Sequence, residues 1–191
     1  MSLSPERAGL QISRADQIWN GNKVIGKAAT LNHHFYTKPP KYMPKMLAGF
    51  KTFSPGQKEV AKKSLQSWSD AANLKFKEVA GSSHAQLKLG QFNYSADGAY
   101  AFSVFPPTFQ GPNRGENWYN GTSPQAASQY GLNGYGRLTF THELGHCLGL
   151  SHPSDYNAGQ RGPLTYQSSA QYVQDTRGYS VMSYFSEKET G

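Results

Sequence analysis

Cysteine is nearly missing from this chain of 191 residues: Cys147 stands alone, so no disulfide can form within the chain. No stretch approaches the roughly 20 consecutive apolar residues that a membrane span needs, so no membrane association is expected. The opening segment MSLSPERAGLQISR also lacks the apolar run of a secretory signal peptide. A chain of this length can bury a sizeable core without disulfides, and we expect one domain, with or without two unequal lobes.

Acidic residues are also few, with 12 Asp and Glu against 19 Lys and Arg, which gives a net charge of +7. The excess lies in residues 1–80, which carry 13 basic and 5 acidic residues, and it is densest in residues 37–51. Such a segment could bind nucleic acid or an acidic partner. No zinc-finger, RNP or helix-turn-helix pattern accompanies it, so a solvated basic loop is the simpler interpretation and no nucleic-acid partner is expected.

The apolar pattern predicts both strands and helices. Ser54-Pro55-Gly56-Gln57 is a capping-box start, followed by an apolar stripe at helical spacing. Adjacent His33 and His34 fall in one predicted strand and so point to opposite faces, which argues against a shared metal site. The predicted strands are 27–36, 75–80, 85–92 and 98–107, with a short one at NWYN. The predicted helices are about 55–73 and about 137–149. Residues 150–178 are expected to be loops.

The segment FTHELGHCLGLSHP, residues 140–153, carries the most specific chemical pattern. His142 and His146 are four residues apart, so on a helix they differ by about 40° and face one side together. Two imidazole nitrogens on one side can occupy adjacent corners of a zinc tetrahedron. Glu143 lies on the flank of this pair, where it can act as a general base toward a zinc-bound water without binding the metal.

A third histidine completes the pattern. Gly149 tolerates the left-handed conformation that ends a helix, so the chain can turn back there and bring His152 to the metal. Three histidines leave one coordination position for water, which is typical of catalytic rather than structural zinc. Cys147 would lie about 100° around the helix from His146, and we expect it to be a buried structural thiol.

Thirty residues beyond this motif, Ser180-Val181-Met182-Ser183-Tyr184 resembles the Met-turn of the metzincin metallopeptidases, in which a methionine underlies the zinc-binding imidazoles. The whole chain is similar to the catalytic domain of the serralysins, secreted bacterial metalloproteases of the metzincin clan. The resemblance rests on these segments: AGLQISRADQIWNG (8–21), KSLQSWSDAANLKF (63–76), SHPSDYNAG (151–159), including the proline after the third histidine, and DTRGYSVMSY (175–184).

The resemblance implies an α+β fold with a twisted, mostly parallel sheet and long helices. It implies one catalytic domain over residues 1–191, with an N-terminal subdomain to about residue 149 and a loop-rich C-terminal subdomain from about 150. It also implies that Tyr184 binds zinc in the resting enzyme and stabilises the oxyanion during catalysis. Zinc held by His142, His146 and His152, with Tyr184 as a further ligand, is thus the expected cofactor.

The expected activity is a zinc-dependent endopeptidase in which Glu143 activates the zinc-bound water. Two alternatives remain: a narrowly specific effector or toxin that cleaves one target, and a zinc-binding interaction module without turnover. We expect a monomer that is secreted by a bacterium, acts on a protein or peptide, and accepts a proteinaceous inhibitor. The glycine-rich calcium-binding repeats of serralysins are missing from the sequence, so no calcium dependence is expected, and the chain is either a natural short form or a piece of a longer protein.

Overall fold

A computed structural model describes residues 1–14, 17–19, 26–41, 43, 47–95, 99–106, 113–122, 134–157, 160 and 162–190. Its internal contacts divide the chain into two units. The strand unit comprises residues 18–148, and the loop unit comprises residues 1–17 together with 149–191. None of the helices among the described residues has both the length and the apolar composition that crossing a bilayer requires.

A five-stranded sheet organises the strand unit, in the order β3-β1-β4-β7-β6. The strands are β1 (Ala29–Phe35), β3 (Leu74–Glu78), β4 (Leu87–Phe92), β6 (Ala101–Ser103) and β7 (Glu116–Asn120). Four of them run parallel, while β6 runs antiparallel to β7 at one edge. A separate antiparallel pair joins β2 (Leu47–Ala48) to β5 (Tyr94–Ser95), and the 3₁₀ turn η1 (Ser82–His84) follows β3. The predicted mostly parallel sheet is confirmed.

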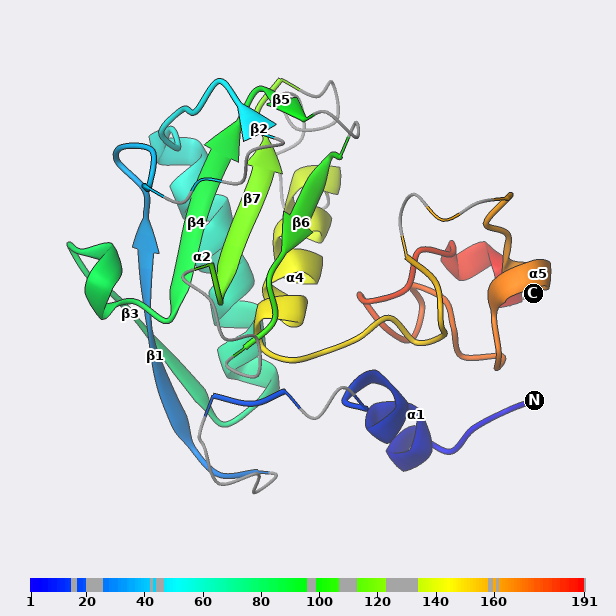
Figure 1. The fold of residues 1–191 in the computed structure, drawn as a ribbon. Coiled ribbons are helices and arrows are strands. Elements are labelled where there is room, and N and C mark those ends of the chain that lie inside the picture. Colours follow the sequence, from blue (N-terminus) through cyan, green and yellow to red (C-terminus); the bar gives the residue numbers. More distant parts are fainter. Residues whose placement is uncertain are drawn as a thin grey trace. The chain divides into compact units, whose positions relative to one another are not determined.

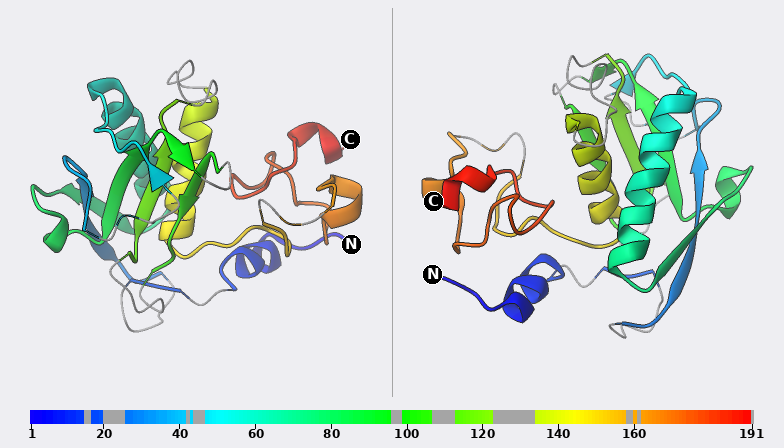
Figure 2. Two further views of the ribbon diagram at one scale, coloured as in Figure 1. Left: turned by 45° about the horizontal axis from the view of Figure 1, so that its top comes forward. Right: turned by 180° about the vertical axis from the view of Figure 1, so that it is seen from behind.

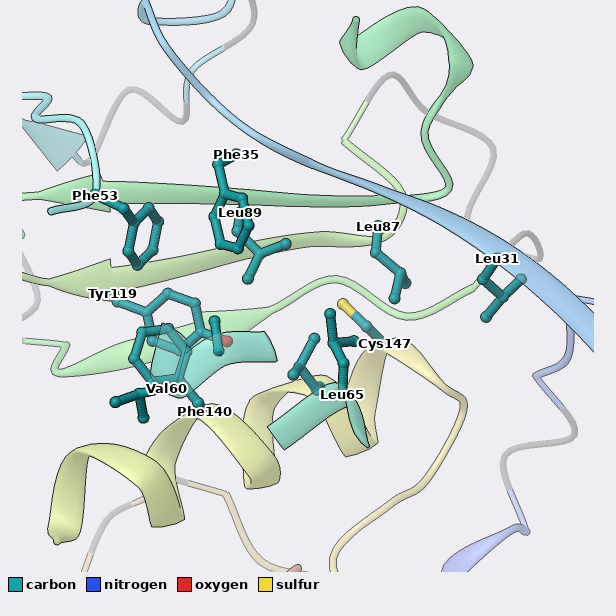
Figure 3. Close-up of a cluster of buried hydrophobic side chains, with 12 residues drawn as sticks. Leu31, Phe35, Phe53, Val60, Leu65, Leu87, Leu89, Tyr119, Phe140 and Cys147 are labelled. Carbon is teal, nitrogen blue, oxygen red and sulfur yellow. The ribbon is translucent and has the colours of Figure 1, made fainter. Parts of the chain in front are cut away.

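Two helices, α2 (Pro55–Ala71) and α4 (Tyr135–Cys147), lie side by side on one face of this sheet (Figures 1 and 2). The α2 helix begins with the predicted capping box, in which Ser54 and Gln57 satisfy each other's backbone N–H groups. Apolar side chains from both helices and from alternate strand positions form the core between the layers (Figure 3). Each large apolar side chain buried there stabilises the fold by about 1.5–3 kcal/mol. The core comprises Leu31, Phe35, Phe53, Val60, Ala61, Leu65, Leu87, Leu89, Tyr119, Phe140, Leu144 and Cys147.

The alternation of β1 separates the two adjacent histidines, as predicted. His33 lies at the core face near Leu31 and Phe35, whereas the Nδ1 atom of His34 lies 2.9 Å from the Val79 carbonyl oxygen. Burial lowers the pKa of His33, which favours its neutral form inside the protein.

The opposite face of the sheet carries a buried carboxylate and a polar hollow of about 510 Å³. Glu116 accepts hydrogen bonds from the Tyr36 hydroxyl at 2.7 Å and from the Trp118 indole at 2.8 Å. Lys38 and Lys41, from the basic segment noted in the sequence, line the hollow and are exposed. Lys51 of the same segment is exposed too, whereas Leu47 is buried. The choice between a solvated basic loop and a binding segment stays a prediction.

The loop unit joins the first residues of the chain to the last ones. It contains α1 (Pro5–Ile12), α5 (Tyr166–Ser169) and η2 (Glu187–Thr190). The Ser151 amide donates to the Ile12 carbonyl at 2.6 Å, and the Val173 amide donates to the Met1 carbonyl at 2.8 Å. Short helices and loops linked by hydrogen bonds, with no strand among the described residues, thus form this unit.

Several sequence predictions were wrong in detail. Among the described residues of the strand expected at 98–107, only Ala101–Ser103 form a strand, and the active-site helix begins at Tyr135, two residues before the predicted start. The α1 helix was not predicted, although Ser4 caps it and Pro5 stands at its first position, which is a recognisable start signal. The composition of 110–125 and 131–136, rich in glycine and asparagine, also predicts loops around the NWYN strand. Residues 110–112, 123–125 and 131–133 lie outside the described residues, whereas Tyr135 and Gly136 belong to α4 and not to a loop.

Candidate active site

The α4 helix carries the first part of the candidate site. Its apolar side packs into the core through Phe140 and Leu144, which turns His142 and His146 toward one common point. Their Nε2 atoms lie 3.1 Å apart. Two Zn–N bonds of about 2.0–2.1 Å at a tetrahedral angle place their nitrogens about 3.3 Å apart. The pair therefore fits two ligand positions of one zinc ion.

Glu143 lies between these histidines in sequence and is buried. Its Oε2 atom accepts a hydrogen bond from the Ser103 hydroxyl at 2.7 Å. Burial raises the pKa of Glu143 to about 7, and the hydrogen bond from Ser103 opposes that rise. A buried carboxyl group with a pKa near neutrality is suited to accepting and returning a proton.

His152, in the loop unit, is oriented by its own loop. Its Nδ1 atom lies 2.8 Å from the Tyr156 carbonyl oxygen, so Nδ1 carries the hydrogen and Nε2 carries the lone pair. The Tyr156 ring stacks on the imidazole, with centroids 5.2 Å apart. Burial lowers the pKa of His152, while the Tyr156 carbonyl opposes the change. A neutral imidazole in a fixed tautomer is the form that binds metal ions.

The Met-turn lies in the same unit and is fastened to the His152 loop by a buried carboxylate. Met182 is fully buried. Asp175, also fully buried, accepts hydrogen bonds from three hydroxyl groups: Ser154 at 2.5 Å, Tyr156 at 2.8 Å and Ser183 at 2.8 Å. Sequence reasoning missed this role of Asp175. Its position in DTRGYSVMSY gave no local signal, because its partners lie up to 21 residues away.

Tyr184 packs directly against the third histidine. The two ring centroids are 4.4 Å apart, and the Tyr184 amide donates to the Tyr156 hydroxyl at 3.4 Å. The tyrosine ring therefore lies beside His152, as the Met-turn resemblance implies. Its role as a ligand or as an oxyanion donor remains a prediction.

Two further residues shape the loop that carries His152. Gly149 has φ +104°, the left-handed conformation expected for it, and a Cβ there would collide with the Gln17 carbonyl oxygen. Arg14 donates to the His152 carbonyl at 2.6 Å and forms an ion pair with Asp155 at 2.8 Å. The contribution of Arg14 was not predicted, because it lies 138 residues from His152 in sequence.

Cys147 takes no part in the candidate site. Its side chain is fully buried in the core, and its thiol lies 3.3 Å from the Val104 carbonyl oxygen. Burial raises the pKa of the Cys147 thiol, which keeps it protonated and unreactive. The prediction of a structural thiol is confirmed.

Replacing Asp175 with asparagine tests whether this carboxylate holds the loop unit together. We expect Asp175→Asn to lower the free energy of unfolding by about 1.5–3 kcal/mol, the contribution of a hydrogen bond to a charged group. Zinc affinity should fall roughly 10–100-fold, as is typical when a group that supports a ligand is lost. Denaturant unfolding and competition with a chelator measure the two effects. The control is Glu189→Gln, which changes an exposed carboxylate of the same unit; equal losses in both variants would contradict the role of Asp175.

The fold and the helix motif together define an α+β catalytic domain of the metzincin type. The family model described as Matrixin, Peptidase M10, matches residues 51–172. The chain therefore belongs to the matrixin family of zinc metallopeptidases, and it is of the serralysin type.

Three curated relatives illustrate the similarity. The serralysin of Photorhabdus laumondii is 42% identical over 96% of this chain, and Metalloprotease AprA of Pseudomonas entomophila is 43% identical over 100% of this chain. Serralysin C of Dickeya chrysanthemi is also 43% identical over the full length of this chain. The chain spans 38–40% of the length of these relatives, so it corresponds to one part of them.

Proposed function

We propose that this chain is a zinc-dependent endopeptidase, formed as one catalytic domain from both units. The observation that carries the proposal is the geometry of α4, where two imidazole nitrogens 3.1 Å apart flank a buried carboxylate. His142, His146 and His152 each offer one imidazole nitrogen as a ligand atom. Only five residues, Gly149 among them, separate His146 from His152 in the sequence, so the third histidine follows the other two closely along the chain.

The chemistry follows from the types of group present. Bound zinc supplies Lewis-acid activation of a water molecule and of the scissile carbonyl group. The Glu143 carboxylate takes a proton from that water and later returns it to the leaving amine nitrogen. The Tyr184 hydroxyl donates a hydrogen bond to the oxygen on which negative charge develops.

The substrate proposed for this site is an extended segment of a protein or peptide. The β6 strand forms one edge of the described sheet, and an extended peptide can pair with such an edge through main-chain hydrogen bonds. By analogy with the serralysins, the protein would act after secretion from a bacterium, as a monomer and under the control of a proteinaceous inhibitor.

Incubation with a peptide library tests the proposed activity. Mass spectrometry should detect internal cleavage that a zinc chelator abolishes and added zinc restores. A panel of unrelated denatured proteins then separates broad digestion from the cleavage of one target by a specific effector. If the zinc-loaded protein cleaves neither library nor panel, a binding module without turnover would replace the endopeptidase.

Tyr184→Phe tests the role of the tyrosine hydroxyl. We expect zinc binding to stay nearly intact, because the three imidazoles hold the metal. Turnover should fall by about 10²–10³, the usual loss when one oxyanion donor is removed. Tyr166→Phe is a matched control, since its hydroxyl donates to the Val173 carbonyl in an exposed part of the same unit. A kcat for Tyr184→Phe within about threefold of the parent would leave Tyr184 with a packing role only.

A further inference from the structure

The Ser103 hydroxyl makes a contact that the zinc motif does not account for. In the register of the sheet, Ser103 on β6 lies opposite Asn117 on β7. Both side chains lie on the sheet face that α4 covers, because Asn117 alternates with Trp118, which belongs to the opposite face. The serine therefore lies between the edge strand and the helix that carries the proposed base.

The hydroxyl has three acceptors within reach. Its oxygen lies 2.7 Å from the Glu143 Oε2 atom, 2.9 Å from the Glu143 carbonyl oxygen and 3.0 Å from the Asn117 Oδ1 atom. A serine hydroxyl has one hydrogen and can serve one acceptor at a time. The Oε2 atom is both the nearest acceptor and the only one on an ionisable group, and hydrogen bonds to charged oxygens are the stronger ones.

The surroundings of this hydroxyl are rigid. Asn117 is fully buried, and its Oδ1 atom lies 3.4 Å from the Tyr119 hydroxyl. Two backbone bonds lie next to the ends of the paired strands: the Val104 amide donates to the Glu116 carbonyl at 2.9 Å, and the Gly115 amide donates to the Val104 carbonyl at 3.1 Å. Ser103 is thus fixed by its strand, by its cross-strand neighbour and by the helix.

We propose that Ser103 is a positioning residue for the general base: its hydroxyl holds the Oε2 atom of Glu143 in one rotamer and so leaves Oε1 as the oxygen that exchanges the proton. This inference rests on the proposed endopeptidase function. A carboxylate held by one oxygen loses fewer conformations when it meets water, and misplacing a catalytic group by about 1 Å can cost as much as 10²-fold in rate.

Kinetics of two variants test this role. Ser103→Ala, which lacks the hydroxyl, should lower kcat about tenfold or more while KM changes less than about twofold, because the ground-state binding of substrate is untouched. Ser103→Thr keeps the hydroxyl and suits a strand, so it should restore kcat to within about threefold of the parent. Ser64→Ala is the matched control: it removes a fully buried hydroxyl that bonds to Thr141 of α4 and not to Glu143. An equal loss of kcat in Ser103→Ala and Ser64→Ala, or no rescue by threonine, would overturn the proposal.

A double-mutant cycle on the zinc-free protein tests the contact without any turnover. If Ser103 and Glu143 interact, Ser103→Ala should lower the melting temperature clearly in the parent and much less in a Glu143→Ala background. Equal shifts of the melting temperature in the two backgrounds would show that Ser103 does not interact with Glu143, and the proposal would fail. The cycle needs no peptidase activity, so it separates the two proposals. If Ser103 and Glu143 interact but the protein cleaves no peptide, the endopeptidase function is refuted and the contact is still established.

Discussion

Glu143→Gln should retain the fold and bind one zinc per chain, yet lose nearly all turnover. The amide has almost the same shape as the carboxylate and can still accept the Ser103 hydrogen bond, but it cannot take a proton. A general acid–base group contributes about 10²–10⁴-fold to the rate, and Glu143 is proposed to serve in both halves of the reaction. The value of kcat on a fluorogenic peptide, with zinc content by elemental analysis, measures the effect.

The control for this substitution is Glu59→Gln, which changes an exposed carboxylate on α2 in the same unit. It should behave like the parent in both measurements. If Glu143→Gln kept more than about a tenth of the parent activity, another group would have to be the base.

His146→Ala should release most of the zinc. The substitution leaves His142 without the nitrogen that lies 3.1 Å from its own Nε2 atom, and two imidazoles hold zinc far more weakly than three. The loss of affinity should exceed the roughly 10–100-fold that follows when only a supporting group is removed. Elemental analysis after dialysis measures the metal, and circular dichroism checks that the fold is retained.

His84→Ala provides the matched control, because His84 is exposed in the η1 turn and its imidazole Nδ1 atom lies 3.3 Å from the hydroxyl of the neighbouring Ser83. That variant should keep its full zinc content. Stoichiometric zinc in His146→Ala would instead show that His146 is not a ligand.

The elements that the sequence predicted well are those with strong local signals. The capping box at Ser54 and the apolar stripe behind it are sufficient to define α2, and alternation defines β1 and β4. The strand around Ser103 was predicted too long, because its aromatic pattern continues beyond the three residues that pair with β7. Local periodicity shows which residues suit a strand, whereas pairing depends on the neighbouring strand.

The candidate site divides in the same way. The residue types and spacing of His142, Glu143 and His146 are local properties of one helix, so the sequence was enough to predict them. Ser103, Asp175 and Arg14 were not predicted, because each acts on a group between 21 and 138 residues away. Serine, aspartate and arginine are common on protein surfaces, and only the folded chain brings these three into contact with the site.

The hydrogen bonds between the two ends of the chain also affect how the protein is made. The α1 helix leaves the ribosome before the strand unit does, but the Ser151 amide that bonds to the Ile12 carbonyl is synthesised 139 residues later. At about 5–20 residues per second, roughly 7–30 s separate the two events. During that interval a helix of eight residues has no tertiary partner and is too short to be stable alone. The loop unit, with the His152 loop and the Met-turn, is therefore assembled only after the Met-turn has been synthesised, whereas the strand unit can fold before that.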